Sequence, residues 1–357
     1  MISFSKFYKN KKVLITGVTG FKGSWMALWL LHLGCKVQGI GFQPNNNKKL
    51  FYDLKLHKKI SLSLFDIRDY KKLDSLLKKK KPSIIFHLAA QPLIFESYKK
   101  PFQTMDININ GTLNLLEVVR KNNFVKSLVI VTSDKCYESN NSTKGFKEND
   151  KLGGIDPYSA SKASMEIITK AYCKSFFDQE KKSVGVSTGR AGNVIGGGDW
   201  SKNRIIPDCI RAFNLKKKIF IRNPNFNRPW QHVLEPIKGY LLLGMLQYKK
   251  PIKYSGAWNF GTNPKSTTTV KEIVKYIIKF WGTGAFTIKK NKLYEQVNLQ
   301  LNISKAKKQL NWTPSYNIKK SVKFTVDWYK EVLKNKKSCI QTTLNQIKKY
   351  MNDSKIN

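Results

Sequence analysis

A short apolar run, a glycine-rich loop and a helical stretch follow one another near the start of the chain. Residues 13–16 (VLIT) are apolar or β-branched, the spacing G-x-x-G-x-x-G covers 17–23, and an apolar stretch covers 24–33. This order predicts a strand, a tight loop and a helix whose N-terminus offers free N–H groups and a positive dipole end to an anion. The loop predicts a pyrophosphate site, although glycine-rich turns also serve as plain connections.

Strand-like and helical stretches alternate through the first half of the chain. This alternation predicts an α/β fold, a Rossmann-type doubly wound parallel sheet, with a smaller C-terminal substrate-binding domain. We expect strands at 37–42, 83–88, 127–132 and 184–187, and helices at 112–121 and 159–177. With 357 residues, we expect a dinucleotide-binding domain over 1–190, a mainly substrate-binding domain over 191–335, from which some segments return to the first, and a Lys-rich, solvated helical tail over 336–357.

The chain carries a formal net charge of +42, which would suit a nucleic-acid or membrane-surface partner. Only seven of the 65 basic residues are arginines, whereas proteins that read nucleic acid depend on bidentate arginine contacts. The lysine excess therefore indicates a solvated charged surface, and we expect no nucleic-acid partner. A nucleic-acid-binding protein on the same fold is the alternative from another class.

Cysteine usage and hydropathy indicate the compartment in which the protein works. Five scattered cysteines without C-x-x-C spacing support neither a disulfide framework nor a zinc site, so we expect no metal and a reducing, cytoplasmic location. The most apolar stretch, 25–33, is too short to span a bilayer and lacks a signal-peptide layout. We therefore expect no membrane partner.

The end of the second expected strand lacks the acid that normally holds the adenosine ribose. The strand ends in Gly-Phe-Gln at 41–43, and the next acid is Asp53. No arginine follows to hold a 2′-phosphate, although Lys48 and Lys49 lie nearby, so the residues favour NAD without excluding NADP. Asp66, after the third strand, is expected either to contact the adenine or to act as a loop or helix-cap acid.

Tyr158 and Lys162 are four residues apart and share one face of an expected helix. An adjacent ammonium favours the phenolate of a tyrosine, and the same lysine can donate to cofactor ribose hydroxyls. The pair is common by chance, so its weight depends on Ser133, Asp134 and Lys135 at the C-terminal end of a strand, where α/β sheets place their chemistry. Ser133 can share a substrate hydroxyl proton with Tyr158. Asp134 and Lys135 form a second acid/base pair that a simple hydride transfer does not need.

These residues resemble the extended short-chain dehydrogenase/reductase superfamily, whose members modify nucleotide sugars. Within it, longer motifs closely resemble the CDP-glucose 4,6-dehydratase family, at 17–25, 87–92 (HLAAQP), 132–137 (TSDKCY), 192–200 (GNVIGGGDW) and 228–233 (RPWQHV). The similarity extends from Lys12 to about Trp328. It implies an NAD-dependent lyase that converts CDP-glucose into CDP-4-dehydro-6-deoxyglucose and water for deoxysugar and surface polysaccharide biosynthesis. Superfamily members are usually dimers, so it also implies a homodimer or a higher homo-oligomer.

The resemblance further implies a role for each group. Tyr158, assisted by Ser133, takes the proton from the sugar 4-hydroxyl while hydride leaves C4 for the nicotinamide. The 4-ketone acidifies the C5 hydrogen, Asp134 protonates the departing 6-hydroxyl, and Lys135 has the position of the C5 base. The better-known dTDP-glucose dehydratases have Asp-Glu here, and an ion pair with Asp134 is the alternative role of Lys135. Another nucleotide-sugar 4,6-dehydratase, or a 4-epimerase, which needs no C5 base, is the alternative within the fold.

The expected contacts follow from the same reasoning. The cofactor is expected to contact Gly17, Thr19, Gly20, Phe21, Lys22, Gly23, Asp66, Ile67, Leu88, Ala89, Ala90, Tyr158 and Lys162. The nucleotide-sugar substrate is expected to contact Gln91, Asn108, Asn193, Arg204, Arg228 and His232. The two arginines offer planar donors for two phosphates, and Trp200 or Trp230 offers a stacking face. Trp230 is equally a core candidate, Asn108 is equally a helix cap, and His87 is interpreted as a structural histidine.

Overall fold

Seven parallel strands form the central sheet of the computed structural model, which describes residues 3–42, 50–138, 145–178, 184–221, 223–263, 267–288 and 300–356. The strand order is β11-β6-β5-β4-β1-β2-β3. An order of 3-2-1-4-5-6 is that of a doubly wound Rossmann sheet, so the expected fold class is confirmed, and β11 adds a seventh strand. The strands are β1 (Lys12–Thr16), β2 (Lys36–Gly41), β3 (Ser61–Leu64), β4 (Ile84–His87), β5 (Ser127–Val131), β6 (Gly185–Ala191) and β11 (Gly256–Phe260).

Helices cover both faces of the sheet. Val13 and Ile15 of β1 pack with α2 and α9, whereas Leu14 packs with α4, α6 and α7 on the opposite face. Burial on both faces explains why β1, β4 and β5 are apolar almost throughout, whereas β3 (SLSL), at the edge of the sheet, alternates and is partly exposed. The helices are α1 (Phe4–Tyr8), α2 (Phe21–His32), α3 (Leu50–Asp53), α4 (Tyr70–Lys80), α5 (Ile94–Lys99), α6 (Pro101–Arg120), α7 (Pro157–Tyr172), α8 (Ile205–Asn214), α9 (Leu234–Lys249), α10 (Pro251–Tyr254), α11 (Val270–Trp281), α12 (Ser304–Leu310), α13 (Ile318–Lys334) and α14 (Cys339–Asp353).

The expected boundaries agree with the structure to within a few residues, except at α6. This helix begins at Pro101 rather than at residue 112; the sequence did not predict its first half because that half is rich in Asn and Ile, which have low helix propensity. Thr104 and Asn108 of that half are nevertheless fully buried, and α6 packs along α7. The helix that carries Tyr158 begins at Pro157, and a π-helical turn over Cys173–Phe177 follows it. Tertiary packing therefore outweighs local propensity in α6.

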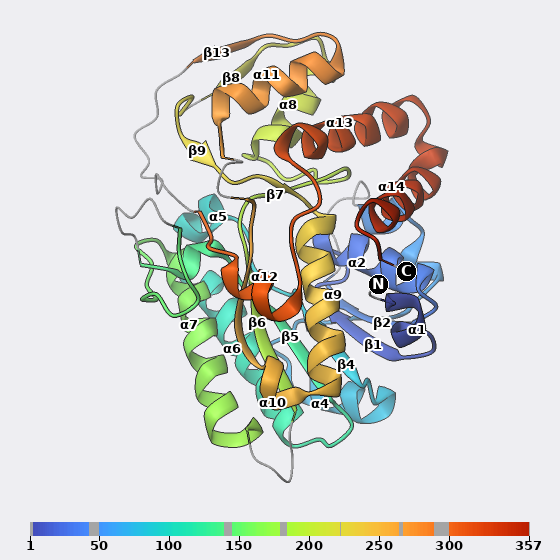
Figure 1. Cartoon of the computed structure of the whole chain (residues 1–357), viewed down its shortest axis with the longest axis vertical. Helices are drawn as coiled ribbons and strands as arrows, with labels where there is room; N and C mark the ends of the chain where they lie inside the picture. The colour runs from blue at the N-terminus through green and yellow to red at the C-terminus, as the bar shows by residue number, and fades with distance from the viewer. Residues whose placement is uncertain are drawn as a thin grey trace.

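The residues after β6 build a smaller lobe and then return to the sheet. In this lobe β7 (Val194–Ile195) pairs with β10 (Gln231–His232), β8 (Ile219–Ile221) pairs with β13 (Phe286–Ile288), and β9 (Asn227–Arg228) pairs with β12 (Thr268–Thr269). Figure 1 shows α8, α11 and α13 grouped with these strands above the main sheet. The chain returns downward in α9, which packs on β4, β5 and β6, and in β11.

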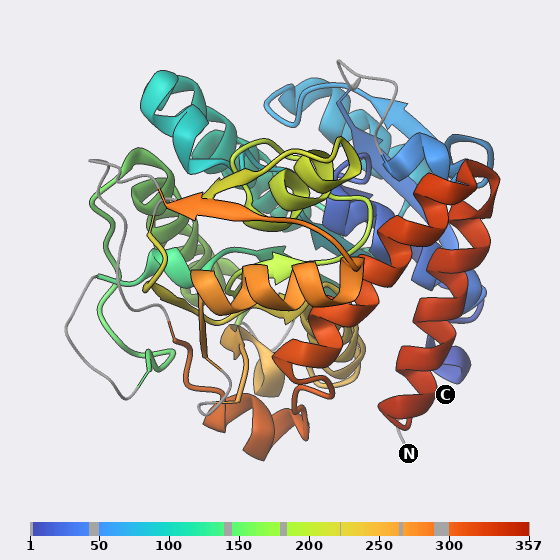
Figure 2. The ribbon, with the colours of Figure 1, turned by 90° about the horizontal axis from the view of Figure 1, so that it is seen from above.

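The C-terminal segment is helical, as expected, but the expectation that it is solvated is wrong. α14 packs on α2, with the rings of Trp29 and Tyr350 5.8 Å apart, and the hydroxyl of Tyr350 donates a 2.6 Å hydrogen bond to buried Glu235. Figure 2 shows α14 beside the N-terminal elements. The buried residues of α14, namely Cys339, Thr343, Ile347, Tyr350 and Met351, recur at three- or four-residue spacing among polar residues, so the polar, lysine-rich composition of the segment concealed a buried face.

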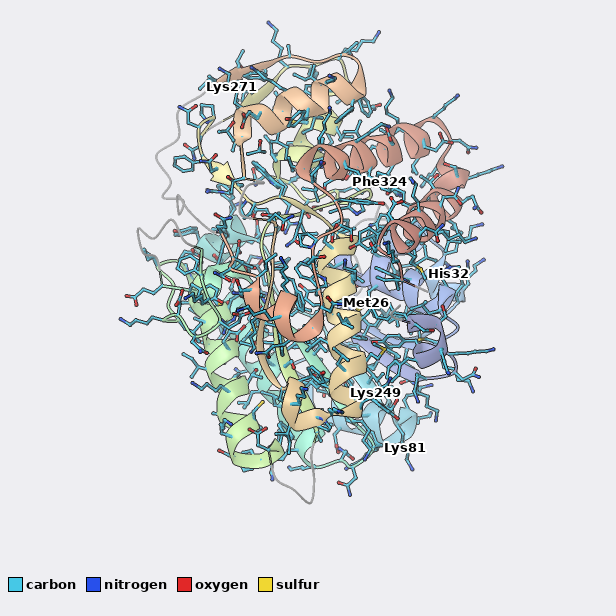
Figure 3. All side chains as sticks on the ribbon, in the orientation of Figure 1. Met26, His32, Lys81, Lys249, Lys271 and Phe324 are labelled. Atoms are coloured by element: carbon cyan, nitrogen blue, oxygen red, sulfur yellow. The ribbon has the colours of Figure 1, made fainter. Side chains whose placement is uncertain are left out.

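Lysine side chains are distributed widely over the surface. Lys81, Lys249 and Lys271 are exposed and lie at separate places on the outside of the molecule in Figure 3. No helix among the described residues combines the length and the apolar character that crossing a bilayer requires.

Candidate active site

A cleft of about 1910 Å³ lies between the C-terminal ends of the sheet strands and the smaller lobe. All residues expected to hold the cofactor line it, as do the five expected catalytic residues. Four of the six residues expected to contact the substrate line it as well, namely Gln91, Asn193, Arg204 and Arg228. The strand order reverses between β1 and β4 at this edge, which is where doubly wound sheets bind their ligands.

The glycine loop at one side of the cleft has the geometry of an anion site. Gly17 has φ +69°, and a Cβ atom on it would lie 2.7 Å from the backbone nitrogen of Ala89, so only glycine fits between β1 and the end of β4. α2 begins directly after Gly20, which has no side chain to cap the helix. The first N–H groups of α2 therefore face the cleft without a side-chain cap and are available to a phosphate.

The part of the cleft where the adenosine of the cofactor is expected lies at the C-terminal ends of β2 and β3. Phe42, directly after β2, is 64% exposed and lines the cleft, while Lys48 and Lys49 lie outside the described residues. Asp53 lines the cleft and pairs with Lys336 at 3.3 Å. Both carboxylate oxygens of Asp66 accept hydrogen bonds from Arg68, and this pairing lowers the pKa of Asp66.

Ser133, Asp134 and Lys135 lie on a short 3-10 turn directly after β5. The Ser133 hydroxyl caps this turn by accepting from the backbone nitrogen of Lys135, and it donates to Oδ1 of Asp134 at 2.9 Å. The other Asp134 oxygen, Oδ2, is buried and has no hydrogen-bond partner among the described residues. Burial raises the pKa of Asp134, while Lys135, Ser133, Arg228 and Lys22 act in the opposite direction. Asp134 is therefore suited to hold a proton at a higher pH than an ordinary aspartate.

Tyr158 and Lys162 lie in the first two turns of α7, which Asp156 caps through the backbone nitrogen of Ser159. Burial raises the pKa of Tyr158 to about 12, although a hydrogen bond with Ser133 and the charge of Arg204 lower it. Burial also lowers the pKa of Lys162 to about 7, with a further decrease from Lys22. Desolvation thus outweighs the expected stabilisation of the phenolate by the lysine.

Arg204 and Arg228 line the side of the cleft formed by the smaller lobe. The Nη1 atom of Arg204 donates to Oδ2 of Asp199 at 3.0 Å, and Oδ1 of Asp199 accepts from the backbone nitrogen of Ser201. The guanidinium of Arg228 lies over the ring of Phe226 at 5.3 Å. Lys22, on the glycine loop, has a pKa lowered to about 8 by burial and then by Arg204. Positive charge is therefore concentrated between the glycine loop and the smaller lobe.

Two of the residues expected to contact the substrate, Asn108 and His232, do not line the cleft. Asn108 lies in the middle of α6 rather than at a helix start, is fully buried, and bonds the backbone of Gln91 and the hydroxyl of Ser161. His232 is fully buried beside Trp25, Tyr316 and Phe324, and burial lowers its pKa to about 3. Neither side chain lines the cleft, so the expected contact of Asn108 and His232 with the substrate stays a prediction that the geometry of the cleft does not support.

His87 agrees with its interpretation as a structural histidine. Its ring nitrogens contact the hydroxyls of Thr16 at 2.7 Å and Thr112 at 3.1 Å, and burial lowers its pKa to about 3. Trp230 is 5% exposed and belongs to the core while one edge lines the cleft. The described residues include no group of three or more His, Cys, Asp or Glu side chains that could hold a metal ion.

The sequence analysis did not identify Glu166, which is buried behind the catalytic residues. Its carboxylate accepts from Thr132, Thr188 and Arg190. The available signal was its spacing, four residues after Lys162 and eight after Tyr158, which places an acid on the buried face of the same helix.

The parallel sheet, the glycine loop and the Ser133, Tyr158 and Lys162 arrangement define an extended short-chain dehydrogenase/reductase of the epimerase and dehydratase type. The family model described as GDP-mannose 4,6 dehydratase matches residues 14–325, and the chain belongs to this family.

Individual relatives agree with this assignment. The chain is 41% identical to the CDP-glucose 4,6-dehydratase of Salmonella typhimurium over 91% of this chain and 92% of that protein. A solved structure of dTDP-glucose 4,6-dehydratase from Bacillus anthracis in complex with NAD is 25% identical, with a TM-score of 0.73 over 90% of this chain and 97% of that one. The UDP-glucose 4-epimerase of Stenotrophomonas maltophila, 19% identical with a TM-score of 0.79, covers 91% of this chain and 99% of that one and shares the fold.

Proposed function

We propose that this chain is a CDP-glucose 4,6-dehydratase, an NAD-dependent hydro-lyase that converts CDP-D-glucose into CDP-4-dehydro-6-deoxy-D-glucose and water. The observation that carries the proposal is the 41% identity with an enzyme of that name over 91% of the chain. The site supports it, because Asp134 and Lys135 stand on the same turn as Ser133, beside the helix of Tyr158 and Lys162. The product belongs to deoxysugar and surface polysaccharide biosynthesis.

The residues of the cleft fit NAD. Gly17 leaves room for a close approach, the N-terminus of α2 suits the pyrophosphate, and Asp66 and Ile67 line the end suited to the adenine. Lys162 is buried next to Tyr158 and is placed to donate to ribose hydroxyls. Bound NAD would accept the hydrogen at C4 of the sugar as hydride and return it to C6.

Tyr158 and Ser133 handle the proton of the first step. As the C4–H bond breaks, the phenolic oxygen of Tyr158 takes the proton of the 4-hydroxyl, and a 4-ketone remains. The pKa of about 12 in the structure means that Tyr158 needs added positive charge to ionise near neutral pH. A protonated Lys162 supplies part of such charge, and bound NAD in its oxidised form would supply more.

Asp134 and Lys135 carry out the elimination. Lys135 as a neutral amine removes the proton at C5, which the ketone has acidified, and the C5–C6 double bond forms as the C6–O bond breaks. Asp134 donates a proton to the departing 6-hydroxyl, so water leaves. A proton is then added at C5, and the hydride that bound NAD would return is added at C6. The product therefore has the composition of the substrate minus one water. The raised pKa of Asp134 supports its role as the acid.

The smaller lobe supplies contacts for the nucleotide diphosphate. Arg204, held by Asp199, and Arg228 offer planar donors, and Asn193 and Gln91 line the same cleft. Trp200, packed at 5.1 Å against Tyr329, lines the same region and offers a face to the sugar or the base.

The experiment that tests the proposal is turnover with CDP-glucose, dTDP-glucose, GDP-glucose and UDP-glucose, each with and without added NAD. We expect CDP-glucose to be converted fastest, into a product with the near-ultraviolet absorbance of a 4-keto sugar in alkali. A galactose product without keto sugar would establish the alternative 4-epimerase, and preference for another nucleotide would establish a different dehydratase.

We further propose a homo-oligomer in a reducing, cytoplasmic compartment. Phe102 of α6 and Ile167 of α7 are 82% and 56% exposed, which suits pairing of these helices with a second copy. All five cysteines are free and buried, which suits a compartment without disulfides. Light scattering on the pure protein tests the first point, and a monomer at micromolar concentration would contradict it.

A further inference from the structure

A buried ion pair lies directly behind the catalytic residues. The Nη2 atom of Arg190, on β6, contacts Oε2 of Glu166, on α7, at 2.7 Å, and both side chains are 3% exposed. Removing two charges from water costs about as much as their attraction returns, so such a pair is weak evidence for stability. Its hydrogen bonds to neighbouring residues indicate another role.

Glu166 holds the residue before the catalytic turn. Its Oε1 atom accepts a 2.5 Å hydrogen bond from the hydroxyl of Thr132, which directly precedes Ser133. Its Oε2 atom accepts from the hydroxyl of Thr188 on β6 at 2.7 Å, in addition to the bond from Arg190. One carboxylate therefore joins α7 to the ends of β5 and β6.

Arg190 holds the residue after the catalytic turn. Its Nη1 atom donates to the hydroxyl of Tyr137 at 2.6 Å, and its guanidinium lies over the Tyr137 ring at 4.7 Å. Tyr137 directly follows the turn over Asp134–Cys136, and its hydroxyl donates to Asn259 of β11 at 2.8 Å. The turn is thus fixed at both ends by the two members of one ion pair.

We propose that Glu166 and Arg190 are positioning residues that fix the turn carrying Ser133, Asp134 and Lys135 relative to Tyr158 and Lys162. Glu166 is suited to this because it shares α7 with Tyr158 and Lys162, so the bond to Thr132 sets the distance between the two groups of catalytic residues. This inference rests on the proposed function, which assigns oxidation mainly to α7 and elimination to the turn.

Loosening the turn is expected to slow the elimination more than the oxidation at C4. Tyr158 and Lys162 keep their helix, and of the groups on the turn only Ser133 assists oxidation, whereas both groups assigned to elimination, Asp134 and Lys135, lose a fixed position. A misplacement of about 1 Å costs about 100-fold in rate. We therefore expect elimination to slow by about 10- to 100-fold while oxidation at C4 changes much less, so that reduced cofactor accumulates on the enzyme.

Thr132 offers a matched pair of variants. Thr132→Val keeps the shape but removes the hydroxyl, and Thr132→Ser keeps the hydroxyl. With CDP-glucose and NAD, stopped-flow absorbance of the reduced cofactor and the rate of product formation separate the two steps. We expect accumulation of reduced cofactor in Thr132→Val, nearly unchanged kinetics in Thr132→Ser, and the same direction of change in Tyr137→Phe. Equal slowing of both steps, or equal behaviour of Val and Ser, would overturn the proposal.

A second measurement does not depend on the substrate. Backbone amide hydrogen exchange at residues 133–137 is expected to be faster in Thr132→Val than in Thr132→Ser, by more than the exchange of amides in the strands of the central sheet changes between the same two variants. If the unsubstituted chain leaves CDP-glucose untouched, the proposed function fails, and the exchange still decides on the positioning role. Unchanged exchange in the valine variant would overturn that role even in an active enzyme.

Discussion

Gly192 lies against Oδ2 of Asp134, a buried carboxylate oxygen without a hydrogen-bond partner in the part of the chain that the structure describes. A Cβ atom on Gly192 would be 3.0 Å from Oδ2 of Asp134 and 3.4 Å from Cγ of Pro229. Such a contact would be tighter than ordinary van der Waals packing, so glycine at 192 leaves free the space beside Oδ2, where we propose that the 6-hydroxyl binds. Glycine at 192 thus keeps the path open between the carboxylate of Asp134, the proposed acid, and the 6-hydroxyl.

Gly192→Ala is expected to slow elimination by about 10-fold, because the added methyl group displaces Asp134 by a fraction of an ångström. Oxidation at C4 depends on Tyr158 and is expected to change less. Transient absorbance of the reduced cofactor measures both steps, and NAD binding serves as the control for folding. A Gly192→Ala enzyme with unchanged product formation would contradict this account of the contact.

Asp134→Asn is expected to lower product formation by about 100- to 10000-fold, because the amide has no proton to donate at ordinary pH. The raised pKa of Asp134 also gives a sign for pH dependence. The acid acts in its protonated form, so kcat of the unsubstituted enzyme falls as the pH rises through that value. The pH profile of kcat in both proteins is the measurement. If kcat of Asp134→Asn still falls at high pH as it does in the unsubstituted enzyme, a group other than Asp134 donates the proton.

Lys162→Met is expected to stabilise the protein without NAD while abolishing its activity. Burial lowers the pKa of Lys162 to about 7, so between pH 7 and the unfolded value near 10.5 the folded chain binds fewer protons than the unfolded chain. The cost to folding is therefore full below the folded pKa and disappears as the pH rises past the unfolded value. Methionine removes a cost of up to about 4 kcal/mol near neutral pH.

Denaturant unfolding near neutral pH and near the unfolded pKa of lysine measures this effect. The stability gain of Lys162→Met should decrease as the pH rises. A gain that is equal at both pH values would show that packing, not the buried charge, causes it.

Asp199→Asn is expected to raise KM for the nucleotide sugar by about 10-fold and to leave kcat nearly unchanged, because it weakens the hold on Arg204 rather than the chemistry. Arg204→Lys is expected to act in the same direction, since lysine loses the planar donor pair. Arg120→Lys, on a surface ion pair with Glu117, is the matched control. A decrease in kcat with KM unchanged in Asp199→Asn would contradict the role of Arg204 in substrate binding.

The sequence predicted β1, β2, β4, β5 and β6 because they are short apolar or β-branched runs between helical stretches and turn residues, whereas it gave no bounds for β3 and did not predict β11. It also predicted Ser133, Asp134, Tyr158 and Lys162 as neighbours, because strand ends and helix starts meet at one edge of such a sheet. It did not predict the burial of α14, because the segment from 336 on is polar and lysine-rich as a whole, and the buried positions of α14 are few and spread along its length.

Other features depend on contacts between distant residues and left no local signal. The burial of His232 depends on Tyr316 and Phe324, more than eighty residues later in the chain. The role of Gly192 depends on the position of Asp134, and that of Glu166 on Thr132 and Arg190. Side-chain packing in three dimensions, not sequence spacing, decides each of these cases.

The most direct test of the account follows the hydrogen at C4. CDP-glucose carrying deuterium at C4 is incubated with the enzyme and NAD, and the product is analysed by NMR. The account predicts a 4-keto-6-deoxy product with the deuterium at C6, because the hydrogen leaves C4 and returns to C6 within one active site. Deuterium retained at C4 of a galactose product, or deuterium released in free reduced cofactor, would contradict it.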